Sequence, residues 1–156
     1  IGQGGADVSA VTLHVGMGTF RPIAVADPAD HPMHAEWAEV SAAAAREITE
    51  ARTQGGRIVN VGTTVVRTLE TVAAQQRAAG ASELLAPWQG ESRLFIRPPY
   101  EFLATDALLT NFHFPRTTLL LLVQAFGGVE LIREAYAKAI EQQYRFYSYG
   151  DAMLIQ

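Results

Sequence analysis

Residues 57–73 combine a short strand, a glycine turn and a helix, and this order restricts the fold more than any other part of the chain. The run 57–61 has the length and apolar content of a strand, Gly62 interrupts it, and apolar residues then recur at helical spacing as far as Ala73. Further strand and helix patterns alternate along the sequence, which is typical of a sheet covered by helices. We therefore predict an α/β fold with a mixed sheet flanked by helices.

The remaining elements follow from the same two periods. Alternation over 11–15 and 34–40 predicts two strands, with His14 on the face opposite Leu13. Ser41 is a typical cap for the helix that comes next. The other expected elements are strands at 94–96, 107–109 and 152–155, helices at 115–127 and 131–140, and a helix end with a surface loop over 75–90.

Length and composition limit the class of protein. The 156 residues fit a single domain, 1–156, and 49% hydrophobic with 18% charged residues allows a core without disulfides. The lack of cysteine excludes thiolate chemistry and is consistent with a reducing cytoplasm. A net charge of -4 argues against broad electrostatic binding of nucleic acid, and the apolar run 119–123 is far too short for a membrane span. We expect a soluble protein and, because Ile1 is not Met, a fragment.

Residues 110–118 place hydrogen-bonding side chains between phenylalanines, directly before the apolar run 119–123. Core segments are usually either apolar throughout or amphipathic, so a ligand site is the simplest explanation of this polar cluster. Pro115 suits the first turn of a helix. The positive end of that helix would then lie close to Asn111 and His113.

The turn after the 57–61 strand carries a second candidate site. Thr63 and Thr64 open the helix, and Arg67 lies one turn inside it, where the macrodipole disfavours a cation unless an anion is held at the same end. One hypothesis is a site for a carboxylate or phosphate. The alternative is that Thr64 caps the helix and Arg67 is solvated.

Residues 16–20 are rich in glycine. Gly16 and Gly18 leave the main chain unobstructed, so that a ligand can approach the backbone beside Thr19 and Phe20. A turn without a ligand is the alternative. The segment does not open a helix as a dinucleotide-binding motif does.

Histidines and one carboxylate supply groups for proton transfer. His31, His34 and Glu36 can ligate a metal, exchange protons with a substrate, or make structural hydrogen bonds. Pro32 breaks the regular spacing that would favour a metal, and no cysteine supports one. His14 is either an acid or base, or a hydrogen-bonded strand residue.

Residues 144–151 are unusually aromatic and include Arg145. Such a segment either stacks nucleobases or packs against the edge of a core. Asp151, which follows Gly150, is either a turn cap or a polar contact to a ligand.

Several of these segments together resemble one family, the S-adenosylmethionine:tRNA ribosyltransferase-isomerases of queuosine biosynthesis. The matching segments are 13–20, 31–36, 61–70, 106–113 and 144–155. Their order and separations agree across nearly the whole chain. The resemblance covers only the C-terminal half of such an enzyme. It implies the C-terminal part of the large α/β domain, without the inserted β-barrel, and a missing N-terminal half that completes the site.

The resemblance implies a reaction. The ribosyl portion of S-adenosylmethionine is transferred and isomerised onto 7-aminomethyl-7-deazaguanine in tRNA, giving epoxyqueuosine-tRNA, adenine and methionine. The sulfonium acidifies the ribose C5′ protons, so the reaction needs a base, an acid for adenine and an anchor for the methionine carboxylate. S-adenosylmethionine is a co-substrate, and no prosthetic group, metal or membrane partner is implied.

The resemblance also assigns roles to residues of this chain. Proton transfer falls to His14, His34 and His113, with Glu36 orienting His34. The binding residues are Gly16, Gly18, Thr19 and Phe20 at the nucleoside, Arg67 with Thr63 and Thr64 at the carboxylate or phosphate, and Asn111, Tyr149 and Asp151 as further polar contacts.

Two other functions remain open on the sequence alone. A noncatalytic fragment would bind tRNA or a nucleoside without releasing adenine. A methyltransferase would leave S-adenosylhomocysteine as its product, but the glycine-rich strand-to-helix signature of that fold is not convincing here.

Overall fold

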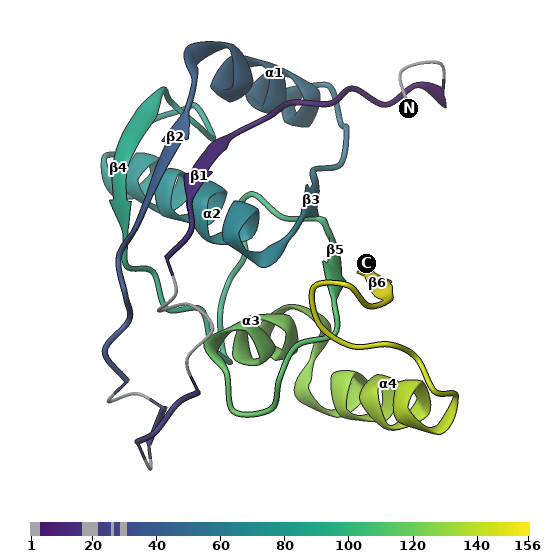
Figure 1. Ribbon diagram of the computed structural model, residues 1–156. Helices are drawn as coiled ribbons and strands as arrows, with labels where there is room; N and C mark the ends of the chain where they lie inside the picture. The colour runs from purple at the N-terminus through teal and green to yellow at the C-terminus, as the bar shows by residue number, and fades with distance from the viewer. Residues whose placement is uncertain (1–3, 17–21, 26, 29–30) are drawn as a thin grey trace.

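The computed structural model describes residues 4–16, 22–25, 27–28 and 31–156, which form two three-stranded sheets and four helices (Figure 1). The antiparallel sheet has the order β1 (Thr12–His14), β2 (Glu36–Val40) and β4 (Trp88–Ser92). The mixed sheet has the order β3 (Val59–Val61), β5 (Ala107–Asn111) and β6 (Ala152–Ile155), with β3 parallel and β6 antiparallel to β5. The expected α/β fold with a mixed sheet is confirmed.

The four helices are α1 (Ala42–Thr53), α2 (Thr63–Ala78), α3 (Thr118–Gly127) and α4 (Val129–Glu141). Figure 1 shows α2 in the centre, between the two sheets, with α3 and α4 on the opposite side of the molecule from α1. Within the described residues, no helix is both long and apolar enough to span a membrane.

The central helix α2 is buried on more than one side because it belongs to two cores. Leu69 packs with Val40 of β2 and Ala44 of α1 in one core. Val66, one turn earlier, packs with Leu108 of β5 in a second core that also includes α3 and α4. Fully burying side chains of this size contributes roughly 1.5–3 kcal/mol each, so α2 ties the two sheets together.

Local signals in the sequence set the helix ends. The Ser41 hydroxyl accepts a hydrogen bond from the Ala44 N–H at 3.1 Å, which confirms Ser41 as the cap of α1. The helix ends before Gly55, whose φ of 81° is the left-handed conformation that favours glycine. The expected closing strand at 152–155 is also confirmed.

The strand expected at 94–96 is wrong, because the strand lies earlier, at Trp88–Ser92, where it pairs with β2. The backbone beyond β4 is held by side chains instead of a ladder. The Arg67 Nε donates to the Leu94 carbonyl at 3.1 Å, and the Leu94 N–H donates to the Ser92 hydroxyl at 3.3 Å.

The expected start of α3 at Pro115 is also wrong. Arg116 has a φ of 55°, which interrupts any helix, and Thr117 caps α3 by accepting from the Leu120 N–H at 3.3 Å. Residues 112–117 of the polar cluster therefore lie on a turn between β5 and α3.

A buried carboxylate on α2 holds the loop that leads into β5. Glu70 is 0% exposed and accepts hydrogen bonds from the N–H groups of Leu103 and Ala104, both at 2.9 Å, and from the Thr105 hydroxyl at 2.7 Å. Burial, with the nearby Glu70 carboxylate as a further cause, raises the pKa of Tyr100 to about 12. This network fixes the position from which β5 begins.

Candidate functional site

The topology of the mixed sheet brings three connections to one edge. β3 and β5 are parallel, so Val61 and Asn111 both end at this edge. β6 is antiparallel, and its first residue, Ala152, pairs with Asn111. The turn after β3, the turn after β5 and the loop before β6 therefore meet. The carboxyl ends of strands in open α/β sheets are where ligands usually bind.

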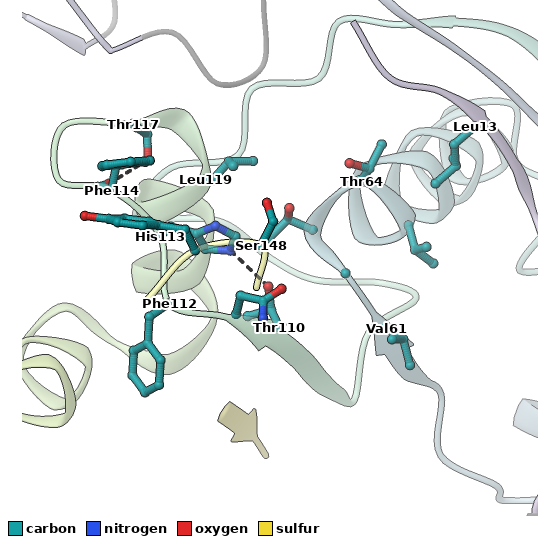
Figure 2. Close-up of a pocket in the computed structure, with 15 residues that line it drawn as sticks. Leu13, Val61, Thr64, Thr110, Phe112, His113, Phe114, Thr117, Leu119 and Ser148 are labelled. Carbon is teal, nitrogen blue, oxygen red and sulfur yellow. Dashed lines mark hydrogen bonds between the residues drawn. The ribbon is translucent and has the colours of Figure 1, made fainter. Parts of the chain in front are cut away.

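A cavity of about 290 Å³ lies at this edge. Its apolar wall includes Leu13, Val61 and Leu119, and its polar lining includes Thr63, Thr64, Thr110, Asn111, His113 and Ser148. Figure 2 shows Leu13, Val61 and Thr64 across the cavity from His113 and Thr117. A few polar groups in a mainly apolar hollow are typical of a small-molecule site.

The first turn of α2 forms one side of the cavity. Gly62 precedes the helix with a φ of 94°, and its N–H donates to the Leu109 carbonyl at 2.8 Å, which joins the turn to β5. Gly62 has no side chain with which to cap the helix, and the first N–H groups of a helix have no partner within it. A carboxylate or phosphate bound beside Thr63 and Thr64 would satisfy these groups.

His113 lies on the opposite side of the cavity. Its Nε2 is 2.9 Å from the Thr110 hydroxyl, the bond drawn in Figure 2, and its backbone N–H donates to the Tyr136 phenol at 2.8 Å. Burial lowers the pKa of the His113 imidazole to about 4, so this ring is neutral at pH 7. A neutral imidazole can accept a proton and does not repel a cationic ligand.

Aromatic packing positions His113. Phe112 is buried and contacts Tyr136 and Phe146, with ring centroids 5.3 and 4.9 Å apart. Burial also raises the pKa of the Tyr136 phenol, which keeps it neutral as the partner of the His113 backbone. Because Phe112 and His113 are adjacent in sequence, fixing the Phe112 ring in the aromatic cluster also limits where the His113 side chain can lie.

The structure brings Thr63, Thr64, Asn111 and His113 together at the cavity. It does not place the other described candidates there: Gly16, His14, His34, Glu36, Arg67, Tyr149 and Asp151 are outside the lining. Gly18, Thr19 and Phe20 lie outside the described residues. On either side of them, Leu13 reaches the cavity and the Ile23 N–H donates to the Arg116 carbonyl at 2.7 Å.

Arg67 is neither solvated nor beside the cavity. Its guanidinium forms an ion pair with Glu36 at 2.6 Å, and the residues are 3% and 4% exposed. Burial lowers the pKa of Arg67, while the charge and hydrogen bond of Glu36 oppose that shift. The inference that this arginine needs a bound external anion is therefore wrong, because the chain supplies the anion itself.

The remaining candidates lie on exposed surfaces. His14 packs against Trp37 with ring centroids 4.7 Å apart, on the face of β1 opposite the Leu13 side chain, as the strand period predicts. His34 is exposed and precedes β2, and its orientation by Glu36 stays a prediction. Tyr149 is 98% exposed.

Asp151 acts as a turn cap. Its carboxylate accepts from the Arg145 N–H at 2.7 Å and forms an ion pair with the Arg145 guanidinium at 3.1 Å. The backbone hydrogen bond from Arg145 is the main cause of a lowered pKa for Asp151. Its carbonyl accepts from the Asn111 amide at 3.2 Å, which joins this loop to β5.

The cavity lining also includes residues that the sequence did not single out one by one, among them Thr110, Phe114, Tyr147 and Ser148. Thr110 and Phe114 were inside the polar cluster, and the spacing of Thr110 and His113 was the available signal for their contact. Tyr147 and Ser148 reach the cavity through strand order, which no local pattern reveals. Among the described residues, no three side chains gather in a way that would hold a metal.

Comparison with known proteins identifies the family. Residues 1–155 match the family model described as Queuosine biosynthesis protein. A curated S-adenosylmethionine:tRNA ribosyltransferase-isomerase of Coxiella burnetii is 54% identical over 151 residues, 97% of this chain and 42% of the relative. The protein of the same name from Thiobacillus denitrificans is 53% identical over 152 residues, with the same two coverages.

A solved structure is similar as well. The S-adenosylmethionine tRNA ribosyltransferase of Thermotoga maritima superposes with a TM-score of 0.68 at 49% identity, over 78% of this chain and 41% of that chain. The chain thus spans less than half the length of these relatives. A match over nearly its whole length shows that the chain belongs to the queuosine biosynthesis protein family.

Proposed function

We propose that this chain carries part of an S-adenosylmethionine:tRNA ribosyltransferase-isomerase and that its cavity binds the sulfonium nucleoside. The supporting observation is the convergence of Thr63, Thr64, Asn111 and His113 at the carboxyl ends of β3 and β5. The names of the relatives support the reaction class. The ribosyl group would pass to 7-aminomethyl-7-deazaguanine in tRNA, giving epoxyqueuosine-tRNA, adenine and methionine.

The methionine carboxylate is assigned to the first turn of α2. The unpartnered N–H groups and the positive dipole there favour an anion, and the hydroxyls of Thr63 and Thr64 add donors. Arg67 contributes indirectly, because its bond to Glu36 joins the next turn of α2 to β2. An arginine that is already paired leaves no net positive charge to repel the sulfonium.

His113 is assigned to the ribose. Its neutral imidazole is the proton-accepting form, and it lies across the cavity from the α2 terminus that would hold the other end of the ligand. Removal of a C5′ proton by such a base would open the sugar with loss of adenine, which takes a proton from an acid. The tRNA amine would then attack, and the C–S bond would break with methionine as the second leaving group. The proton-transfer roles of His14 and His34 remain predictions for the assembled enzyme, as does lining of the pocket by Gly16, Gly18, Thr19 and Phe20.

The test joins this chain to the part of its relatives that the match does not cover, and measures adenine release from S-adenosylmethionine with tRNA present. We expect adenine and methionine. S-adenosylhomocysteine as the product would reject ribosyl transfer in favour of methyl transfer. His113→Ala should lower single-turnover adenine release by about 100-fold or more, as loss of a general base does. Gln142→Ala, at the exposed end of α4 and outside the cavity lining, is the control.

The same assay examines the exposed candidates. His34→Ala should depress turnover if the imidazole takes part in proton transfer, and unchanged single-turnover release would remove it from the chemistry.

Asn111→Ala and Thr64→Val should weaken binding of S-adenosylmethionine, because both side chains line the cavity.

A second candidate function is a noncatalytic fragment that binds tRNA or a nucleoside. It is favoured by the cavity lining, because hydrogen-bonding side chains in a mainly apolar hollow can hold a ligand whether or not the ligand reacts. This function predicts retention of tRNA or S-adenosylmethionine by the 156-residue chain without any adenine release. Release of adenine by the chain alone would reject it.

A further inference from the structure

Two aromatic rings at the rim of the cavity stack on each other and are not buried in a core. The rings of Phe114 and Tyr147 have centroids 3.5 Å apart and planes within 15°. Both residues line the cavity, yet Phe114 is 50% exposed and Tyr147 is 41% exposed. The pair therefore presents aromatic surface to any ligand that enters or leaves.

Tyr147 has a backbone conformation that a tyrosine rarely adopts, and hydrogen bonds hold it there. Its φ of 72° is in the left-handed region, which is unusual for a bulky residue. The Tyr147 N–H donates to the Phe112 carbonyl at 2.9 Å, and the Tyr147 carbonyl accepts from Gly150 at 2.9 Å. The exposed ring is thus fixed by hydrogen bonds from the end of β5 and from its own turn.

The turn around Tyr147 is closed tightly at its other end. A Cβ on Gly150 would collide with the carbonyl oxygens of Arg145 and Phe146, and the Asp151 carboxylate accepts from the Arg145 N–H. A side chain that only filled a core would not need a strained and closely bonded loop to keep it half exposed.

A flat ring pair with exposed faces suits a flat ligand. Every nucleobase has a π-face, and stacking on an aromatic side chain is tolerant of base identity. Tyr149, from the same turn as Tyr147, is 98% exposed. Arg116, close to Phe114 in the sequence, is exposed and forms no ion pair with the described residues. Aromatic rings with an exposed cation nearby match the chemistry of a nucleotide.

We propose that Phe114 and Tyr147 form a stacking site for a nucleobase at the mouth of the cavity. The base has two available sources, a nucleotide of the RNA substrate next to the modified position, or the adenine of S-adenosylmethionine. The choice of these probes rests on the proposed function, whereas the stacking geometry does not.

The test uses the 156-residue chain and two probes. One is an anticodon stem-loop RNA with 2-aminopurine beside the target guanine, a base whose fluorescence is quenched when it stacks. The other is S-adenosylmethionine, titrated by calorimetry. Tyr147→Asn removes the ring and tolerates the left-handed backbone, Tyr147→Phe keeps the ring, and Tyr144→Asn changes a 46%-exposed tyrosine outside the cavity lining.

We expect Tyr147→Asn to weaken binding of one probe about tenfold, while Tyr147→Phe and Tyr144→Asn bind like the parent. A loss confined to the RNA, with loss of quenching, assigns the site to an RNA base. A loss confined to S-adenosylmethionine assigns it to adenine. Unfolding of each variant by circular dichroism identifies any that fail to fold, and Phe114→Leu then supplies the second variant.

The inference is overturned if Tyr147→Asn is folded and binds both probes as tightly as Tyr144→Asn does. It is also overturned if the parent chain binds neither probe. Because no turnover is measured, a failure of ribosyl transfer in the joined enzyme leaves these binding results unaffected, so the two proposals fail separately.

Discussion

Polar groups have different surroundings in two regions of the molecule. One region is the buried ion pair beside the antiparallel sheet, and the other is the cavity at the end of the mixed sheet. Beside β2 and β4, the Arg67 guanidinium donates hydrogen bonds to the Glu36 carboxylate and to the carbonyls of Ser92 and Leu94, all within the chain. At the cavity, the first turn of α2 and the His113 imidazole face open space. Buried polar groups satisfied within the protein stabilise the fold, whereas polar groups directed at a hollow are available to a ligand.

A single helix connects these two regions. Thr63 and Thr64 lie at the cavity, and Arg67, one turn later, is bonded to β2 and to the segment after β4. The ion pair therefore holds the helix that presents the cavity. Arg67 and Thr64 are one turn apart on the same helix, yet substitutions can distinguish their roles: Arg67 stabilises the fold, and Thr64 lines the cavity.

The largest effect should come from breaking the ion pair. Arg67→Met removes the guanidinium that is paired with the buried Glu36 carboxylate and should lower the free energy of unfolding by about 3–5 kcal/mol in urea denaturation. Arg77→Met is the matched control, because the ion pair of Arg77 with Glu101 is exposed and such pairs contribute about 0–1 kcal/mol. Equal losses of unfolding free energy in the two variants would show that the buried ion pair stabilises the fold no more than the exposed one does.

A second effect should appear as pH dependence at the cavity. The folded pKa of His113 is about 4, below the unfolded value of about 6.5, so the unfolded chain binds more protons between these values. The free energy of unfolding is therefore highest above pH 6.5. It falls by roughly 3 kcal/mol in all as the pH is lowered through about 4.

His113→Gln removes the titrating group and should flatten this part of the stability profile, measured by urea denaturation at several pH values. Gln142→Ala, a change at the exposed end of α4 and outside the cavity lining, should keep the slope of the parent. A parent slope that survives in His113→Gln would place the titration elsewhere.

A smaller effect should separate stability from binding. Gly62 and Gly128 precede α2 and α4 with nearly the same backbone, φ 94° and ψ 144° against φ 83° and ψ 139°. A Cβ at either position meets nothing within 4 Å, so Ala costs only backbone strain, about 1–3 kcal/mol. Both variants should therefore lose similar stability in thermal unfolding.

Only Gly62→Ala should also weaken binding of S-adenosylmethionine by the joined enzyme, since Gly62 lines the cavity and Gly128 does not. Calorimetric titration of the two variants compares them directly. If Gly128→Ala weakens binding as much as Gly62→Ala, the loss reflects stability and not the site.

Features set by neighbouring residues were predictable from the sequence. Ser41 caps a helix through a residue three positions away, and the cluster at 110–113 follows from its own polar residues. The strand–turn–helix unit around Gly62 is equally local, and it carries one side of the cavity. These parts of the fold and site could be found because short-range periods and caps determine them.

Features set by distant residues were not predictable. Glu36 and Arg67 are 31 positions apart, and nothing local indicates that one neutralises the other. The same bond network ends β4 at Ser92, which is why the apolar run at 94–96 misled the strand prediction. Tyr147 reaches the cavity only because β6 is antiparallel to β5, a choice of topology that periodicity does not encode.

The proposed function depends on binding of the sulfonium nucleoside at the carboxyl ends of β3 and β5. Hydrogen exchange of the joined enzyme with and without S-adenosylmethionine, read by mass spectrometry, tests it most directly. We predict slower exchange at 62–66 and 111–114 on addition of the ligand, with β2 unchanged. Slower exchange confined to 34–40, with no change at 62–66, would contradict the account.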